Sequence, residues 1–380
     1  MDGADFLVVG GGVAGLSAAA RLATHGRVAV IEAEEALGYH SSGRSVTFSH
    51  YGIGNATVRG LTQHSRDFFL APPEGDALPL SRQASALFFA TDDMLGALDA
   101  LHADMGHFTD ALEWADEARM KALFPPLKVG EDAAVKGVLD PTGLKLDADA
   151  LLQHYARALR ARGGTIHTGK RLAAIDRKGD MWTVTTESGE AWSAPILINA
   201  AGAWADQIAT LAGVRPLGLQ PKRRTIIAVE PPAGADVGDW PFLKTVTDDF
   251  YMMPEAGTLL ASPVDEIDSD PCDAWPEEYD LAVAAAKVEH YTELSIRRIG
   301  HSWAGLRSFV ADRVPTAGFA PDAPGFFWLA GQGGYGLQTA PAMAEIVETL
   351  VTDAPWPAKL AQAGVTADKI LPARLFAETN

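Results

Sequence analysis

The stretch Asp5-Phe6-Leu7-Val8-Val9-Gly10-Gly11-Gly12-Val13-Ala14-Gly15 decides the fold of this chain. Its apolar run Phe6 to Val9 predicts a buried parallel strand, and Gly10 allows a sharp turn into a helix. Gly12 leaves room for a pyrophosphate at the helix N-terminus, where free N–H groups and the positive end of the helix dipole favour an anion. Gly15 lets the helix lie close to the sheet. The stretch therefore predicts a dinucleotide-binding site.

The residues that follow supply the context that this motif requires. Small side chains continue the expected helix through Ala23 to a stop at Gly26, and Arg27 to Ile31 predicts the second strand. Glu32 comes directly after that strand, where a carboxylate binds ribose hydroxyls and repels a 2′-phosphate. This order of strand, turn, helix, strand and acid favours a nucleotide site over ordinary packing of a glycine-rich helix.

The composition is that of a globular protein with an acidic balance. The 380 residues include 31 Lys+Arg and 49 Asp+Glu, and the net charge of −18 disfavours nucleic acid or an anionic membrane as the main partner. We expect no signal peptide and no transmembrane segment, because every apolar run is well short of ~20 residues. The single cysteine, Cys272, stands among acidic residues and is expected to be an unreactive loop residue. A cytoplasmic location is expected, with attachment to the periphery of an inner membrane left open.

Three separated segments, 1–81, 143–216 and 303–380, are predicted to build the nucleotide-binding domain of an α/β fold. In the second segment, Asp147 is the expected N-cap of a helix that precedes a strand and a three-stranded meander. In the third segment, an apolar strand from Gly325 to Ala330 leads into a glycine-rich loop and a helix from about Ala340 to Val351.

The remaining segments, 82–142 and 217–302, predict a second domain that binds the substrate. Arg223 to Val229, Tyr251 to Pro254 and Thr258 to Ser262 predict strands of a mixed or antiparallel sheet. Glu255-Ala256-Gly257 predicts a hairpin turn between the last two, and Leu281 to Leu294 predicts a helix.

With these elements in order, the chain resembles FAD-dependent oxidoreductases of the D-amino acid oxidase type, and among them the bacterial D-arginine dehydrogenases. Six spaced motifs carry the resemblance: Gly10–Gly15, His40–Ser45, Leu197–Trp204, Gln220–Arg224, Trp303–Ser308 and Gly331–Gln338. It implies a Rossmann-like FAD-binding domain of the glutathione reductase-like type and a substrate domain with a mixed sheet. The implied cofactor is FAD, held non-covalently because this chain lacks the C-terminal cysteine that tethers flavin in some relatives.

The resemblance also assigns residues to the cofactor. On the adenosine and pyrophosphate side these are Gly10, Gly12, Ala14, Gly15, Glu32, Ala33, Ser41, Ser42, Gly43, Arg44, Ser45 and the backbone of Leu172. Around the flavin and its ribityl chain they are Ala200, Gly202, Gly331, Gly333, Gly334, Tyr335, Gly336, Leu337 and Gln338. No metal site is expected, because the ten histidines lack the helical spacing and the nearby acid of a zinc site.

By the same resemblance, Arg224 and Arg307 match carboxylate-binding arginines and Tyr251 matches a substrate-site tyrosine. A planar guanidinium pairs with both oxygens of a carboxylate, and this role is favoured over a structural ion pair. Arg223 should point to the opposite face of its strand and meet solvent or an acid. The candidate catalytic residues are Tyr251, Arg224, Arg307, Gly334, His50 and Tyr51.

Three positions depart from the D-arginine dehydrogenase pattern. Its loop histidine and tyrosine fall on Phe48 and Ile53, and the acid that meets a substrate guanidinium falls on Ser85. A buried cationic substrate group would then lack its partner. We therefore expect neutral or hydrophobic D-amino acids rather than D-arginine, with Leu87 and Phe242 near the substrate. His50 and Tyr51 either supply the missing polar groups or point elsewhere.

The implied reaction is oxidative deamination of a D-amino acid. Hydride passes from Cα to flavin N5, and the imine hydrolyses to a 2-oxo acid and ammonia. Two alternatives remain: an enzyme with the same fold that oxidises secondary amines (of the sarcosine, glycine or proline kind) or 2-hydroxy acids, and a flavoprotein subunit of a larger redox complex. The sequence leaves open whether oxygen, a quinone or another carrier accepts the electrons, and it leaves the oligomeric state open.

Overall fold

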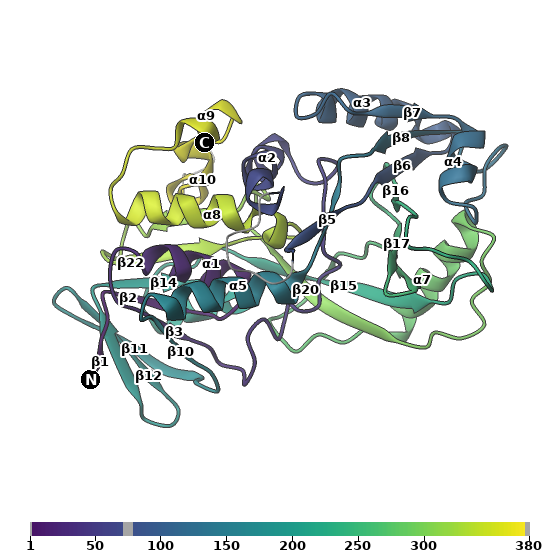
Figure 1. Cartoon of the computed structure of the whole chain (residues 1–380). Coiled ribbons are helices and arrows are strands. Elements are labelled where there is room, and N and C mark those ends of the chain that lie inside the picture. The colour runs from purple at the N-terminus through teal and green to yellow at the C-terminus, as the bar shows by residue number, and fades with distance from the viewer. Residues whose placement is uncertain (1, 71–78, 377–380) are drawn as a thin grey trace.

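The computed structural model describes residues 2–70 and 79–376 (Figure 1). Residues 1, 71–78 and 377–380, which fall in the segments predicted for the nucleotide-binding domain, lie outside the described residues. A six-stranded sheet forms one half of the molecule, in the order β10 (Thr165–His167), β3 (Val28–Ile31), β2 (Phe6–Val9), β14 (Ile196–Asn199), β22 (Phe326–Ala330) and β21 (Thr316–Phe319). The first five strands are parallel and β21 is antiparallel. The predicted α/β class is therefore confirmed.

The strands of this sheet are buried on both faces, as is typical of parallel sheets, and helices cover one of these faces. They are α1 (Val13–Leu22), α5 (Ala148–Ala161) and α8 (Gly336–Val351), with α2 (Ala56–Leu70) packed on α8 (Figure 1). Small side chains along α1 allow this close packing. The predicted N-cap of α5 is confirmed, since the Asp147 carboxylate accepts a hydrogen bond from Ala150 N at 2.9 Å.

The other face carries the predicted meander. Its strands form a four-stranded sheet in the order β1 (Asp2–Gly3), β13 (Ala191–Ala194), β12 (Met181–Thr186) and β11 (Leu172–Lys178). Trp182 and Trp192 fill the core between the two sheets. The connection from β14 continues through a 3-10 turn (Gly202–Trp204) into α6 (Ala205–Leu211).

A nine-stranded mixed sheet forms the other half of the molecule. Its strands are β19 (Ile267–Asp268), β15 (Gln220–Val229), β18 (Thr258–Ser262), β17 (Tyr251–Glu255), β16 (Phe242–Thr245), β6 (Ala86–Ala90), β8 (Lys136–Asp140) and β7 (Glu113–Ala115), with β20 (Ser302–Phe309) paired to β15. The helices packed on it are α3 (Leu95–Gly106), α4 (Glu117–Leu123) and α7 (Glu278–Tyr291). A small sheet of β4 (Phe48–Ser49), β9 (Leu144–Leu146) and β5 (Ser81–Gln83) lies between the halves.

Several helix ends differ from the prediction. Helix α1 ends at Leu22, and helix α8 begins at Gly336 with Pro341 inside it. Thr339 N already donates to the Tyr335 carbonyl at 3.1 Å, so Pro341 lies beyond the unpaired N–H groups at the start of α8 and removes one intrahelical hydrogen bond. Helix α7 begins at Glu278 because Glu277 and Asp280 form a capping box.

Strand β20 pairs with β15 along its whole length, so residues 303–309 share a sheet with the predicted substrate domain although the predicted boundary assigns them to the other domain. The division into two domains stays a prediction. The chain ends in α9 (Ala358–Gln362), α10 (Ala367–Ile370) and a 3-10 turn (Pro372–Leu375), and another 3-10 turn (Asp92–Met94) precedes α3.

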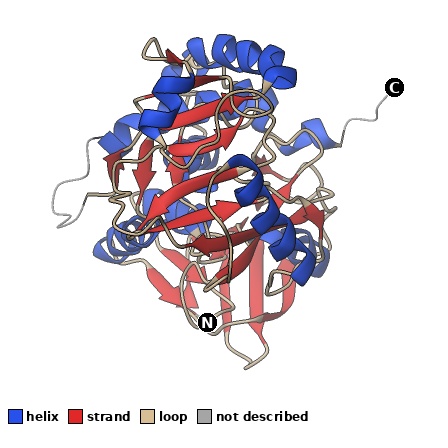
Figure 2. Cartoon of the chain, turned by 90° about the vertical axis from the view of Figure 1, so that its right-hand side faces the viewer, coloured by secondary structure: helices blue, strands red, loops and turns tan. Residues whose placement is uncertain are grey.

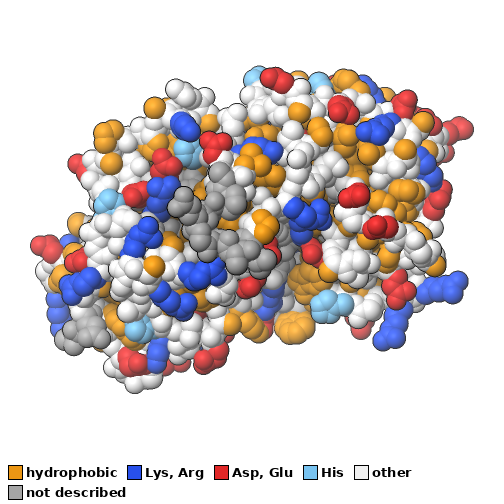
Figure 3. Space-filling view, viewed as in Figure 1, with side chains coloured by type: hydrophobic (Ala, Val, Ile, Leu, Met, Phe, Trp, Pro, Cys, Tyr) orange, Lys and Arg blue, Asp and Glu red, His pale blue; other side chains and the backbone are white. Residues whose placement is uncertain are grey.

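Strands run through the centre of the molecule and most helices lie around them (Figure 2). Acidic and basic side chains are interspersed over the face drawn in Figure 3, so the net charge of −18 forms no single acidic patch on that face. Among the helices of the described residues, none combines the length and the apolarity that a bilayer crossing requires.

Candidate functional site

The glycines of the first turn are packed as the sequence predicts. Gly10 has a φ of 112°, and a Cβ on it would lie 2.4 Å from the carbonyl oxygen of Ala200. A Cβ on Gly15 would lie 2.0 Å from the carbonyl oxygen of Gly10, so this glycine sets the distance between helix and strand. At Gly12 the nearest atom is Ser42 Oγ at 3.2 Å, and the remaining space belongs to a cavity.

Glu32 is fixed at the end of β3. Its Oε2 accepts a hydrogen bond from Gly11 N at 2.5 Å, and its Oε1 accepts one from Glu34 N at 2.8 Å. A cavity of about 420 Å³ opens beside this carboxylate. Of the predicted cofactor residues it is lined by Gly10, Gly12, Glu32, Ala33, Ser41, Ser42, Leu172, Ala200 and Gly202.

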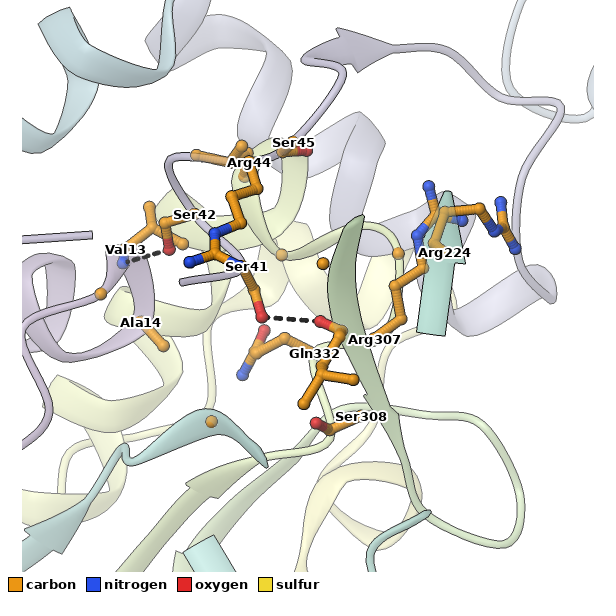
Figure 4. A pocket seen from close by; sticks show the side chains of 18 of the residues that line it. Val13, Ala14, Ser41, Ser42, Arg44, Ser45, Arg224, Arg307, Ser308 and Gln332 are labelled. Carbon is orange, nitrogen blue, oxygen red and sulfur yellow. Dashed lines mark hydrogen bonds between the residues drawn. The ribbon is translucent and has the colours of Figure 1, made fainter. Parts of the chain in front are cut away.

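A second cavity, of about 130 Å³, continues from the first toward the nine-stranded sheet (Figure 4). The two cavities share Gly12, Ser41, Ser42, Ala200 and Gly202. Further predicted cofactor residues line the second cavity: Ala14, Arg44, Ser45, Gly331, Gly333, Gly334, Gly336 and Leu337. Ser42 Oγ accepts a hydrogen bond from Val13 N at 3.0 Å, and Ser41 Oγ donates to the Leu306 carbonyl at 2.6 Å.

Four predicted cofactor residues are engaged in packing or in protein hydrogen bonds. Gly43 lies against Gly38, where a Cβ would be 2.6 Å from the carbonyl oxygen. The Arg44 guanidinium pairs with Asp273 and donates to the Ala274 carbonyl at 2.9 Å. The amide of Gln338 and the hydroxyl of Tyr335 are likewise bonded within the protein.

Gln332 lines the cavity although the sequence analysis did not single it out as a site residue. It lines the second cavity, and its Nε2 is buried without a hydrogen-bond partner within the described ranges. A buried amide nitrogen of this kind indicates a ligand acceptor, because buried polar atoms in proteins are normally satisfied. Its place between Gly331 and Gly333 was the only available signal.

The two arginines come from neighbouring strands, β15 and β20. In their antiparallel register Arg224 faces Gly305 and Lys222 faces Arg307, so both arginines lie on one face of the sheet. Their side chains lie together at one end of the cavity, away from Val13 and Ala14 (Figure 4). A Cβ on Gly305 would meet only Arg44 Cβ, at 3.5 Å.

Arg223 points to the opposite face, as predicted. Its guanidinium lies 2.5 Å from a carboxylate oxygen of Glu277 and 2.9 Å from one of Asp280 at the start of α7. Lys222 lies 2.5 Å from Asp268 on β19. The expectation that Arg223 meets an acid on the opposite face is confirmed, and it follows from the alternation of side chains along a strand. Lys222 lies on the face of Arg224 and also meets an acid.

The environments of Arg224 and Arg307 differ. Arg224 is 4% exposed, donates to the Asp265 carbonyl at 2.7 Å and lies 3.4 Å from Glu266 Oε1. Burial, with a smaller effect of Arg307, lowers its pKa to about 10, so it stays charged at neutral pH. Arg307 is half-buried, and no ion pair or hydrogen bond of its guanidinium occurs among residues 2–70 and 79–376. Gly334 faces Arg307, because a Cβ there would lie 2.8 Å from the guanidinium.

Tyr251 lies on the same face of the sheet. Its cross-strand neighbours are Ser262 on β18 and Lys244 on β16. The side chain is 4% exposed, and its hydroxyl has no hydrogen-bond partner in the part of the chain that the structure describes. Lys244, which sequence reasoning missed, is 4% exposed and lies 2.9 Å from Asp248 Oδ1. A lysine inside a buried strand was the signal that could have found it.

His50 and Tyr51, like Tyr251, lie outside the residues that line these cavities. The His50 ring packs among Phe48, Phe88 and Phe242, and its Nδ1 accepts a hydrogen bond from Gly52 N at 3.0 Å. Burial, and to a lesser extent the charge of Lys244, lowers the pKa of His50 to about 3, so the ring is neutral. Tyr51 stacks on Phe108. Their predicted catalytic role therefore gains no support from the geometry.

The apolar residues expected near the substrate separate into two groups. Phe48 and Phe242 stack at 4.9 Å on the side of Tyr251, and Ile53 lines a third cavity next to Arg307. Leu87 lies in the core on the opposite face of the sheet, so its expected place near the substrate is wrong. The cause is strand alternation: Phe88, not Leu87, shares the face of Tyr251.

Comparison with known proteins identifies the family of this chain. Residues 5–350 match the DAO family model, described as FAD dependent oxidoreductase. Hydrogen cyanide synthase subunit HcnC of Pseudomonas aeruginosa is 23% identical over 262 residues, which are 68% of this chain and 60% of that protein. The chain spans 58% to 60% of the length of the first curated relatives that it matches.

Solved structures share the fold. The L-α-glycerophosphate oxidase of Mycoplasma pneumoniae, with FAD bound, superposes with a TM-score of 0.83 at 21% identity, covering 94% of this chain and 96% of that chain. The glycine oxidase of Geobacillus kaustophilus superposes with a TM-score of 0.82 at 19% identity, covering 97% and 99%. At these identities the similarity concerns the fold alone.

The residues present fit a bound FAD. The helix N-terminus offers free N–H groups beside Gly12, Glu32 lines the first cavity at the end of β3, and the cavities run from there to the buried, unsatisfied Nε2 of Gln332. The family match covers nearly the whole chain. The chain therefore belongs to the DAO family of FAD dependent oxidoreductases, and FAD is its cofactor.

Proposed function

We propose that this oxidoreductase oxidises the carbon–nitrogen bond of a small amine that carries one carboxylate, of the glycine, sarcosine or proline kind. The observation that carries the proposal is the Arg307 guanidinium, which is half-buried and free of partners within the described residues. A guanidinium withdrawn from water is costly unless an anion meets it. Tyr251 offers a buried hydroxyl on the same face.

The charges around Arg307 favour a single carboxylate. Arg224 lies within ion-pair distance of Asp265 and Glu266, and Lys244 is paired with Asp248. Arg307 is then the one cation of this cluster, as far as the structure describes it, that has no carboxylate within ion-pair distance. The likeness in fold to a glycine oxidase supports an amine as the group that is oxidised.

Neutral D-amino acids form the second candidate. The cavity that begins at Arg307 has a volume of about 750 Å³, far more than glycine needs, and Ile53, Val264 and Phe309 contribute apolar wall. A side chain on the substrate could occupy this space. D-amino acids come second because the charges around Arg307 do not distinguish the two configurations at the substrate Cα.

In the proposed mechanism the protein mainly binds and orients the substrate. Arg307 pairs with the carboxylate through its planar fork, and Tyr251 donates a hydrogen bond to it. Gly334 leaves the space that the guanidinium requires. Bound FAD supplies the hydride acceptor. The substrate amine must arrive as the free base, so the rate should rise with pH until the amine is deprotonated.

A flavoprotein without its own activity is the weaker alternative. It would leave both arginines in salt bridges, whereas only Arg224 has carboxylates within that distance. We also propose that FAD is held non-covalently, since Cys272 is exposed and is absent from the lining of the three cavities.

The test is anaerobic reduction of the bound flavin, followed by loss of its visible absorbance. Glycine, sarcosine, L- and D-proline, paired D- and L-alanine, and 2-hydroxy acids are compared. The proposal expects reduction by amines and none by hydroxy acids. Reduction by hydroxy acids alone would overturn it, and reduction by no compound would favour the subunit alternative.

Two variants connect the activity to the site. Arg307→Gln should raise KM about 10- to 100-fold, because a bidentate charged hydrogen bond is lost, while the flavin content stays unchanged. Lys222→Gln is the matched control, since Lys222 lies opposite Arg307 on the same sheet but pairs with the exposed Asp268. Equal effects of the two substitutions would contradict the assignment of Arg307.

A further inference from the structure

The cavity beyond Arg307 is rich in charge. Besides its apolar residues it is lined by Asp248, Glu266, Asp312, Arg307 and Arg313, and it shares Arg307 and Gly334 with the flavin-side cavity. A ligand whose carboxylate lies on Arg307 therefore extends its other end past these charged groups. The charged group of this cavity that still has a free oxygen or nitrogen decides which chemical groups the far end of the ligand can carry.

Two of the three acids are paired with arginines along the wall. Glu266 pairs with Arg313 through both oxygens, at 2.7 and 3.0 Å, and lies 3.4 Å from Arg224. Asp312 pairs with Arg374 at 2.7 Å. The oxygens of these carboxylates already accept hydrogen bonds from guanidinium groups.

Asp248 is arranged differently. It occupies the turn between β16 and β17 in a left-handed conformation, with a φ of 59°. Its Oδ1 lies 2.9 Å from Lys244 Nζ, whereas its Oδ2 has no partner in the described part of the chain. The carboxylate side chain is 52% exposed and the lysine side chain only 5%. Asp248 is thus the member of the pair that faces the cavity, and Lys244 lies behind it.

Lys244 is held in place from a second side. Its ammonium also donates to the carbonyl of Gly52 at 3.2 Å, so it joins the strand to the loop after β4. Burial would raise the pKa of the Asp248 carboxyl, but Lys244, Arg224 and Arg307 outweigh that effect and hold it below its usual range. The carboxylate is therefore ionised at neutral pH.

We propose that Asp248, positioned by Lys244, makes the substrate cavity reject a second carboxylate and accept an uncharged hydrogen-bond donor in its place. This inference rests on the proposed carboxylate site at Arg307. A distal carboxylate would stand beside the Asp248 carboxylate, whose charge Lys244 offsets only from the Oδ1 side, and this approach of like charges is unfavourable. An amide of the same size would instead donate to the free Oδ2 of Asp248. The selectivity comes from repulsion as much as from attraction.

The experiment measures binding to the FAD-loaded protein, so it needs no turnover. Two matched ligand pairs are titrated, succinamate with succinate and glutaramate with glutarate, and the flavin absorbance change gives each Kd. Each pair keeps one carboxylate for Arg307 and differs only in the distal amide or carboxylate. The amide is expected to bind at least about tenfold more tightly than the acid.

Asp248→Asn keeps the shape of the side chain and removes its charge. It should reduce the preference for the amide to about twofold or less, mainly by tightening the binding of the acid. Asp110→Asn, an exposed loop substitution, is the control and should leave both Kd values unchanged. If Asp248→Asn does not fold, the comparison of amide and acid binding to the unsubstituted protein still tests the proposal.

The outcomes separate this inference from the proposed function. Equal binding of amide and acid to the unsubstituted protein would overturn the inference and leave the carboxylate site intact. An unchanged preference in a folded Asp248→Asn variant would also overturn it. Binding of neither ligand would remove the carboxylate site at Arg307, and the inference with it.

Discussion

The hydroxyl of Tyr251 is a buried polar atom without a partner in the described ranges. If it serves a ligand, Tyr251→Phe should raise the Kd of a carboxylate ligand about tenfold, the effect of one lost hydrogen bond. The same substitution should raise the free energy of unfolding by about 1 kcal/mol, because it removes a desolvated group that nothing satisfies. Ligand titration and urea unfolding of the same sample measure both changes.

Tyr291→Phe is the matched control. The Tyr291 hydroxyl lies 3.0 Å from Asp249 Oδ2 and donates to it, at a distance from the cofactor cavities. Its loss should lower the free energy of unfolding by about 1 to 2 kcal/mol and leave ligand binding unchanged. A loss of stability in Tyr251→Phe as large as in Tyr291→Phe would contradict the unsatisfied state of Tyr251.

His50 should make stability depend on pH. Its pKa falls from 6.5 to about 3 on folding, chiefly through burial. Between these values the unfolded chain binds more protons, so stability that is present above pH 6.5 is lost as the pH falls. The slope from this group is at most about 1.4 kcal/mol per pH unit. His50→Asn, which keeps an acceptor for Gly52 N, should give a shallower decline between pH 6.5 and 4 in thermal or urea unfolding.

The exposed His107 provides the control for this measurement. His107→Asn should retain the slope of the unsubstituted protein. Equal slopes for His50→Asn and the unsubstituted protein would mean that His50 gains a proton as readily in the fold as in the unfolded chain. That result would contradict the packing of its ring among three phenylalanines.

At the scale of elements, the alternation of side chains along the strands could be predicted from the sequence. The face of the sheet that a given residue occupies could not always be predicted. The alternation of side chains correctly predicted that Arg223 and Arg224 lie on opposite faces of β15, because adjacent residues of a strand point to opposite faces of the sheet. In β6 every residue is apolar and buried, so its sequence pattern does not tell which of Leu87 and Phe88 faces the side of Tyr251. Lys244 was missed because its partners come from a loop and a turn that the strand pattern does not place.

The hairpin between β17 and β18 offers a test of local sequence. Ala256 has a φ of 48° and Gly257 a φ of 80°, as a two-residue turn with positive φ at both positions requires. An L side chain is strained there, so Ala256→Gly should raise the free energy of unfolding by about 0.5 to 1 kcal/mol. Gly257→Ala should lower it by about 1 kcal/mol. Urea unfolding measures both, and changes of equal sign would contradict the assigned turn.

At the scale of the whole molecule, the spaced motifs predicted the cofactor site better than the substrate site. Glycines, Glu32 and the serines at 41 and 42 meet at one cavity because the first strand, turn and helix fix their positions. The substrate cavity is assembled from loops in different parts of the chain and from the end of β20. Loop conformation depends on long-range contacts such as that of Lys244 with Gly52, which no local pattern encodes.

FAD should stabilise both halves of the molecule together. The flavin-side cavity is lined by Val13 and Gly331 from the six-stranded half and by Arg224 and Gly305 from the nine-stranded sheet. A ligand that binds only the folded state stabilises it by about 2.7 kcal/mol at 100 times its Kd. Hydrogen exchange should therefore slow in peptides that cover β2 and β22 and equally in those that cover β15 and β20. Gly12→Val, which fills the pyrophosphate space, should abolish both effects. Protection confined to β2 and β22 would mean that the flavin end of the cofactor does not engage the second sheet, and the placement of Arg307 beside it would then be wrong.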